Sequence, residues 1–165
     1  MKKYGLNTMI IAFILCCSIG ITAQTTQTNL NQVELMKQFI GTWKTKMGKD
    51  TSFIMTGKTF GKGLEFHWKT ETKGKIISEG MSIMGFDKIN NRIIEPQIWD
   101  NSPNIILWSG LFTSSIKYEA ILLKDISDSE KAMVKWDYEF KSAIILECTY
   151  TVKNKTVAAY TLKKE

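Results

Sequence analysis

The sequence has few residues of the kinds that bind metals or act as nucleophiles. It contains one histidine, His67, and three cysteines in 165 residues. Cys16 and Cys17 lie in an apolar N-terminal segment, so only Cys148 belongs to the body of the chain. A zinc site needs three or four histidine, cysteine or carboxylate ligands, and a catalytic triad needs a histidine beside its nucleophile. The composition therefore indicates no metal, no cofactor and no positive sign of an enzyme.

Clustered positive charge is also missing. The chain has 22 basic and 16 acidic residues, a formal net charge of +6. Its lysines are scattered, as at Lys44, Lys46, Lys58, Lys69, Lys117 and Lys135. Nucleic-acid binding normally requires a basic patch or stripe, and scattered lysines are typical of a solvated surface. We therefore expect no nucleic-acid partner.

The first 23 residues have the three parts of a secretory signal peptide. Lys2 and Lys3 form a basic start, Met9 to Ile21 is almost wholly apolar, and Ala23 is a small residue at the expected cleavage point. The apolar run is shorter than the roughly 20 residues of a permanent membrane helix. We therefore predict a signal peptide at 1–23, export to the periplasm or the medium, and no transmembrane segment in the mature chain.

Two alternatives to cleavage after Ala23 remain. One is a retained N-terminal anchor. The other is a lipoprotein modified at Cys17, although the residues before Cys17, Leu15-Cys16, do not match the small residue that normally precedes a lipid-modified cysteine.

The predicted mature chain is long enough for one domain without a disulfide. Residues 24–29 are polar, and we expect them to act as a tether. Because only Cys148 remains, no intramolecular disulfide can form in the oxidising compartment, and a chain of about 140 residues can be stabilised by its core. We assign residues 30–165 to one domain, whose net charge is +4 once Lys2 and Lys3 are removed.

A short helix is predicted before the strands. Asn31 can cap it and Glu34 follows at capping-box spacing. Val33, Met36, Phe39 and Ile40 recur at helical spacing up to Gly41.

From Trp43 onward the apolar period changes from helical to alternating. In the segment 131–141, Trp136, Tyr138 and Phe140 alternate with charged residues, and 64–70 shows the same pattern around Phe66 and Trp68. Such alternation is typical of strands with one buried face. The strand-like segments are 42–47, 51–56, 64–70, 76–86, 92–99, 105–113, 116–122, 131–141, 143–152 and 156–163.

The short connections determine how these strands are arranged. Turn-forming residues occur at 48–50, 73–74, 90–91, 101–104, 127–129 and 153–154. Short connections force neighbouring strands to be antiparallel, and closure removes the two exposed edges of a long meander. We predict an all-β protein, an antiparallel up-and-down barrel of about 8–10 strands preceded by one short helix. Gly61, Gly63, Gly80, Gly85 and Gly110 would mark sharp bends in this sheet or loops.

Two motifs carry a family resemblance. The segment 35–43 runs from a short helix into Gly41-Thr42-Trp43, and the segment 80–87 ends in Gly85-Phe86-Asp87. Both resemble a bacterial family of exported lipocalin-like (calycin-type) proteins, mostly of unknown function, over about residues 30 to 163. The resemblance implies a ligand-binding barrel with Trp43 at its closed end.

The chain departs from lipocalins in the residue expected over that tryptophan. Lipocalins usually bring a basic side chain, often arginine, from the last strand. The only arginine here, Arg92, lies in mid-chain, which leaves Lys163 and Lys164. Haem-binding relatives use a histidine, but the alternation places His67 on the polar face of its strand, which favours solvent exposure over a ligand role.

The aromatic content points to the candidate site. Five tryptophans in a small domain can line an apolar cavity, although they can equally fill a core. For a barrel that binds a small, largely apolar ligand, the predicted ligand-binding residues are Trp43, Phe66, Trp68, Trp108, Trp136 and Tyr138.

Two other functions remain open at this point. One is a packed-core barrel that acts in protein interaction through loops such as 100–104 or 125–131. The other is an enzyme with acid/base residues at the barrel mouth, drawn from Glu65, His67 and Asp137. Cys148 alternates with apolar residues and is expected to be buried and inert.

Overall fold

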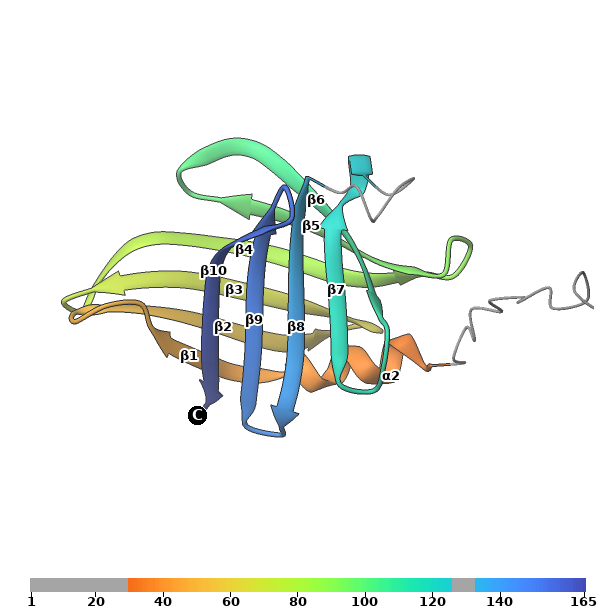
Figure 1. Cartoon of the computed structure of the whole chain (residues 1–165), viewed down its shortest axis with the longest axis horizontal. Coiled ribbons are helices and arrows are strands. Elements are labelled where there is room, and N and C mark those ends of the chain that lie inside the picture. The colour runs from red at the N-terminus through yellow and green to blue at the C-terminus, as the bar shows by residue number, and fades with distance from the viewer. Residues whose placement is uncertain (1–29, 126–132) are drawn as a thin grey trace, which may run out of the picture.

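Ten antiparallel strands close into a barrel in the computed structural model, which describes residues 30–125 and 133–165 (Figure 1). Each strand pairs with the next one along the chain, and the first pairs with the last through Trp43 and Lys164. This confirms the predicted antiparallel barrel. The predicted signal peptide, the tether and the turn at 127–129 lie outside the described residues.

The ten strands fall on the ten segments predicted from alternation. They are β1 (Gly41–Lys46), β2 (Thr51–Phe60), β3 (Gly63–Thr72), β4 (Lys75–Asp87), β5 (Arg92–Trp99), β6 (Ser102–Phe112), β7 (Lys117–Leu122), β8 (Val134–Ser142), β9 (Ile145–Val152) and β10 (Lys155–Lys164).

Two details of the turns differ from the sequence-based expectation. Gly61 lies in the β2–β3 turn with a φ of 59°, so it belongs to a loop rather than a bend within a strand. The turn expected at 101–104 is tighter, because β6 already begins at Ser102. In both places the strands extend further toward the turn than their apolar residues indicate.

The predicted helix forms one short α-helical turn followed by a 3-10 turn. Helix α2 (Gln32–Met36) is capped by Asn31, whose Oδ1 accepts a hydrogen bond from Glu34 N, and η1 (Lys37–Phe39) leads into β1. The second half of the predicted capping box does not form, since the Glu34 carboxylate instead binds Lys37 Nζ at 2.8 Å.

A buried glutamine joins this helix to the barrel. Gln32 Nε2 donates to the carbonyl of Phe112 at 3.1 Å, and Gln32 Oε1 accepts from the backbone N–H of Phe112 at 2.8 Å. The side chain therefore satisfies the last backbone groups of β6 as a neighbouring strand would. This holds α2 against the end of the barrel where β6 ends and β7 begins.

The strands form two groups that cross steeply. In Figure 1 β1–β4 run across the view, whereas β7–β10 run almost vertically. Inward-facing residues of both groups meet in the interior, as alternation predicts for Phe66 and Trp68 of β3 and for Phe140 of β8.

Candidate functional site

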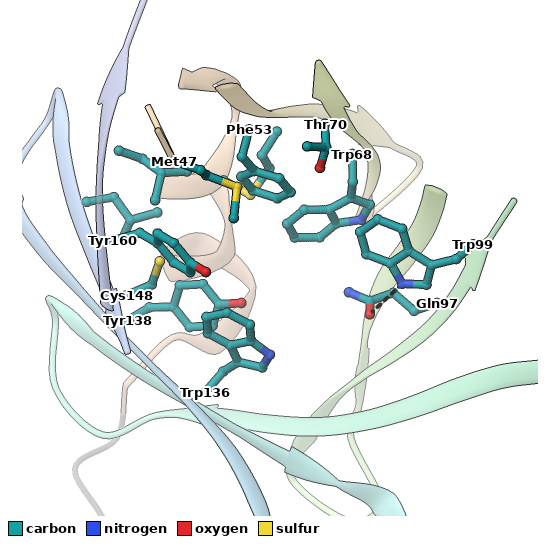
Figure 2. A pocket seen from close by; sticks show the side chains of 13 residues that line it. Met47, Phe53, Trp68, Thr70, Gln97, Trp99, Trp136, Tyr138, Cys148 and Tyr160 are labelled. Atoms are coloured by element: carbon teal, nitrogen blue, oxygen red, sulfur yellow. Dashed lines mark hydrogen bonds between the residues drawn. The ribbon is translucent and has the colours of Figure 1, made fainter. Parts of the chain in front are cut away.

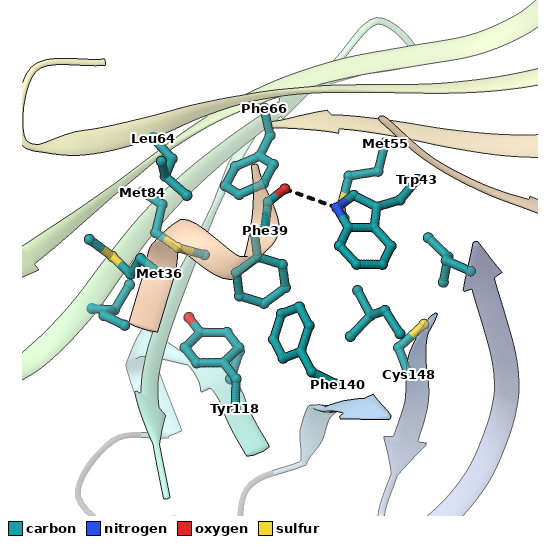
Figure 3. Close-up of a cluster of buried hydrophobic side chains, with 14 of the residues drawn as sticks. Met36, Phe39, Trp43, Met55, Leu64, Phe66, Met84, Tyr118, Phe140 and Cys148 are labelled. Atoms are coloured by element: carbon teal, nitrogen blue, oxygen red, sulfur yellow. Dashed lines mark hydrogen bonds between the residues drawn. The ribbon is translucent and has the colours of Figure 1, made fainter. Parts of the chain in front are cut away.

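One end of the barrel is filled with aromatic side chains. Phe39, from the turn after α2, lies against Phe66, Phe112, Tyr118, Tyr138 and Phe140, with ring centroids 4.9 to 6.1 Å apart. Figure 3 shows Phe39, Phe66, Tyr118 and Phe140 of this cluster, with Met36, Leu64 and Met84 beside them. Phe39 is 2% exposed, so the helix end works as a plug that closes this end of the barrel.

Trp43 belongs to this closed end, as the Gly-x-Trp resemblance implied. It is fully buried, and its indole Nε1 donates to the carbonyl of Phe39 at 3.0 Å (Figure 3). Lys164 of β10 places its Nζ 4.9 Å from the centre of the Trp43 ring. Lysine thus occupies the place where lipocalins use a basic residue, at a distance that allows a cation–π contact.

Gly41 makes room for that lysine. Its φ is +118°, and a Cβ added there would lie 2.4 Å from Lys164 Cε. The backbone conformation is what favours glycine here, since a side chain at this φ would be strained, whereas the end of the Lys164 side chain could shift.

The other end of the barrel contains a cavity of about 250 Å³. Figure 2 shows the side chains that surround it. Its walls are mostly aromatic and apolar, and they come from both crossing groups of strands. The lining residues are Met47, Phe53, Met55, Trp68, Thr70, Gln97, Trp99, Trp136, Tyr138, Leu146, Cys148, Tyr160 and Leu162.

Three of the six predicted ligand-binding residues meet at this cavity. Trp68, Trp136 and Tyr138 line it. Trp43 and Phe66 do not, because they are buried in the filled end, and Trp108 does not line the cavity but donates to the lining residue Gln97.

Sequence reasoning missed several cavity residues for identifiable reasons. Met47 and Trp99 stand at strand ends, where alternation gives little information. Tyr160 lies in β10 among threonines, alanines and lysines, which do not mark it as part of a continuous apolar face. Tyr160 reaches the cavity through its register with Cys148 of β9, which is in register with Tyr138 of β8, whereas Met47 directly follows β1 and Trp99 ends β5.

A polar side chain, Gln97, is held in the cavity wall by two tryptophans. Its Oε1 accepts from Trp108 Nε1 at 3.0 Å and from Trp99 Nε1 at 3.5 Å. An indole N–H can only donate, so these contacts determine which end of the amide carries the oxygen. The Nε2 group therefore points the other way, toward Glu95 Oε1 at 3.4 Å.

Glu95 is a buried acid inside the barrel. It is 6% exposed, and its Oε1 also accepts a 2.6 Å hydrogen bond from Ser82 Oγ, which in turn accepts from Trp68 Nε1 at 3.3 Å. Burial raises the pKa of Glu95 above its ordinary value, and the bonds from Ser82 and Gln97 offset part of that rise. Burial and the charge of Glu95 also raise the pKa of Tyr118 and of Tyr138.

Nothing in the sequence indicates that Glu95 faces inward. In β5 both alternating sets contain large apolar residues, with Ile93 and Trp99 in one and Ile94 and Ile98 in the other. The alternation of apolar residues cannot indicate which face of a strand points into the barrel when both faces are apolar. The structure places Ile93 in the core and leaves Ile98 48% exposed, which turns Glu95 inward.

The polar residues considered at the sequence level lie on the outer face. His67 is 58% exposed and lies 3.9 Å from Glu65, while Asp137 pairs with Lys135 at 3.0 Å. None of the three lines the cavity. The barrel therefore does not bring them together as an interior acid/base group.

Cys148 is buried and unpaired at the cavity wall. Burial raises the pKa of its thiol to about 12, so it is a thiol rather than a thiolate at neutral pH. Across residues 30–125 and 133–165 no group of three or more histidine, cysteine or acidic side chains is placed to hold a metal ion. No helix in those same ranges has the length and hydropathy to cross a membrane.

The comparisons with known proteins assign no family to this chain. No protein-family model matches the sequence, and no curated protein matches it. The closed antiparallel barrel is consistent with a calycin-like architecture.

Proposed function

We propose that this protein is an exported lipocalin-like carrier that holds a small, largely apolar ligand in the cavity at the open end of its barrel. The observation that carries the proposal is the division of the interior into two halves. Phe39 and its neighbours fill one half, whereas the aromatic residues of the other half surround about 250 Å³ of space. A barrel that served only as a packed scaffold would gain stability from filling that space.

The cavity also indicates the size and character of the ligand. Pockets for drug-sized molecules occupy about 300–1,000 Å³, so this ligand is smaller or extends beyond the mouth. Aromatic walls with a few fixed polar groups such as Gln97 and Thr70 suit a compact apolar body with one polar end.

Native mass spectrometry tests the proposal directly. Residues 24–165, purified gently from the envelope fraction of the producing cell, should show a discrete added mass that is lost on denaturation. A mass equal to that of the bare chain, together with no uptake from a panel of small lipids and aromatic compounds, would count against a carrier.

Two variants separate binding from folding. Trp136→Ala removes a cavity wall and should weaken retention of the ligand at least about tenfold, since a buried aromatic contact is worth over 1 kcal/mol. Phe112→Leu is the matched control in the filled end, because the rings it contacts, Phe39, Tyr118 and Phe140, do not line the cavity. It should lower the urea midpoint but leave the dissociation constant unchanged. Equal loss of binding in both variants would mean that the effect reflects folding alone.

One observation favours the alternative of a barrel that acts in protein interaction. The outer face of β4–β6 carries exposed apolar side chains, with Met81 opposite Ile98 and Leu107 opposite Pro96. Contiguous apolar patches of this kind often mark protein contacts. Sedimentation analysis would test it: self-association that Leu107→Glu abolishes supports an interaction role, and a monomer at all concentrations argues against association through this face.

A further inference from the structure

The cavity has a buried acidic residue near its wall and no basic residue in its lining. None of its lining residues is a lysine, arginine, histidine, aspartate or glutamate, and the buried carboxyl of Glu95 accepts a hydrogen bond from the wall residue Gln97. The lysines seen in ion pairs, such as Lys69 and Lys135, are bound to acids on the outer face. In the part of the chain that the structure describes, the cavity therefore has an acid behind its wall and no cation to balance it.

The hydrogen bonds make Glu95 the final acceptor of a chain of donors. Trp68 donates to Ser82, and Ser82 donates to Glu95. On the other side, Gln97 donates to Glu95 while Trp99 and Trp108 donate to Gln97. The direction of the Gln97 branch is fixed, because the amide oxygen of Gln97 accepts from two indoles and its Nε2 can only donate. In the other branch, the Ser82 hydroxyl donates to Glu95 while its oxygen accepts from Trp68. The donors therefore meet at Glu95 Oε1, and within the described residues no donor is bound to its Oε2.

This arrangement treats ligands differently according to their charge. A carboxylate in the cavity would lose its hydration, find no positive partner and lie close to Glu95, which is unfavourable in a low-dielectric interior. An ammonium group would favour the ionised form of Glu95 and be attracted to it, and aromatic faces would stabilise the ammonium through cation–π contacts. Figure 2 shows the rings of Trp68, Trp99, Trp136, Tyr138 and Tyr160 around this one space.

We propose that the cavity takes small apolar molecules that carry a protonated amine and discriminates against carboxylates, with Glu95 and Gln97 as the residues that determine this specificity. The inference rests on the carrier function proposed above. The apolar body of the ligand lies among the rings, and its ammonium group lies over the ring faces of Trp68 and Trp99, on the side of the cavity where Gln97 lies. Glu95 lies behind Gln97, to which it is hydrogen-bonded, and it acts on the ligand through its charge.

Three probes of nearly equal size test the inference. They are 2-phenylethylamine, 2-phenylethanol and phenylacetate, titrated by calorimetry into the unliganded mature protein at neutral pH. The amine should bind about tenfold or more tightly than the alcohol, and phenylacetate should bind most weakly, since cation–π and charge contacts inside a protein reach 1–2 kcal/mol.

Two variants that make the same change in net charge test whether Glu95 causes the preference for the amine. Glu95→Gln keeps the size of the side chain but removes its charge, so the preference for the amine over phenylacetate should shrink by about tenfold while 2-phenylethanol binds as before. Glu119→Gln is the control: it makes the same change of net charge on the outer face, where Glu119 pairs with Lys135, and should leave all three affinities unchanged.

The outcomes separate this inference from the carrier function. If the alcohol binds and Trp136→Ala weakens it, but wild type does not prefer the amine, the carrier stands and the amine specificity is wrong. If Glu119→Gln alters the preference as much as Glu95→Gln, long-range net charge explains it and the role of Glu95 is wrong. If none of the three probes binds at millimolar concentration, the amine specificity and the carrier function both lose their support.

Discussion

At the residue scale, the buried carboxyl of Glu95 lowers the stability of the fold but serves the ligand binding proposed above. An acid with 6% exposure loses most of its hydration, and its neighbours replace it with hydrogen bonds to one oxygen, Oε1. A partly satisfied buried carboxyl lowers stability relative to an apolar or amide side chain. Its presence inside the barrel is easier to explain by an interaction with a ligand than by folding alone.

The first prediction concerns the pH dependence of stability. Because the pKa of Glu95 is higher in the folded chain than its ordinary value of 4.5, the folded state holds this proton more tightly than the unfolded state. Its contribution is complete below pH 4.5 and is lost as pH rises through the raised pKa. Glu95→Gln stays neutral, so its free energy of unfolding should increase relative to that of wild type as pH rises above 4.5.

Urea denaturation of both proteins between pH 4 and pH 8 provides the measurement for this prediction. Glu119→Gln again serves as control, because Glu119 is ion-paired at the surface. A difference between Glu95→Gln and wild type that stays constant over this range would contradict the raised pKa.

At the element scale, two contacts determine how strands and helix meet. Tyr118 of β7 lies directly over Gly110 of β6: a Cβ on Gly110 would stand 2.0 Å from the tyrosine oxygen. Tyr118 is itself buried at 2% exposure, so its ring cannot move out of the way. This glycine permits close strand packing in the filled end.

We therefore expect Gly110→Ala to destabilise the barrel by about 1–3 kcal/mol, the usual cost of overpacking a core. Gly48→Ala is the matched control, since no atom lies within 4 Å of a Cβ built there. Thermal or urea unfolding should separate the two variants, and equal stabilities would mean that the β6–β7 packing relaxes freely.

The link between α2 and β6 yields a third prediction. Gln32→Ala would leave the N–H and C=O groups of Phe112 without their partner, at a cost of about 1–3 kcal/mol for buried unpaired groups. Amide exchange at Phe112 should accelerate in this variant. Gln38→Ala, which removes a donor only to carbonyl groups at Leu35 and Ser115, should leave that exchange rate unchanged.

At the scale of the whole molecule, the barrel is a plugged end joined to a hollow end. Replacing an aromatic residue by alanine should therefore lower the free energy of unfolding by different amounts in the two halves. Phe39→Ala would open a void among five rings and should cost about 3–5 kcal/mol. Trp136→Ala enlarges a space that already exists, so it should cost clearly less, about 1–2 kcal/mol.

Guanidinium or urea unfolding of the unliganded protein compares the two variants. Added ligand should stabilise wild type and Phe39→Ala alike, because mass action depends on binding and not on the filled end. If Trp136→Ala proved the more destabilising of the two, the two halves would not be energetically distinct.

What could be predicted from sequence follows from which interactions are local. Alternation such as that of 134–140 and short turns such as Lys73-Gly74 depend on neighbouring residues, so the ten strands, their antiparallel order and the capped helix could be derived directly. The candidate site was only half predictable. Trp68, Trp136 and Tyr138 have unambiguous alternation, whereas Glu95 lies in a strand with apolar residues on both faces.

The sequence by itself thus determined the elements and their connectivity, and the family resemblance of Gly41-Thr42-Trp43 implied that Trp43 lies at the closed end. Only the tertiary structure decided which face of β5 turns inward, where Lys164 lies, and that the interior is filled at one end and hollow at the other. The physical reason is how far apart in the chain the interacting residues lie. Hydrogen bonding and alternation act between near neighbours or paired strands, but a cavity is the volume left over when ten strands close. That volume depends on all inward side chains at once.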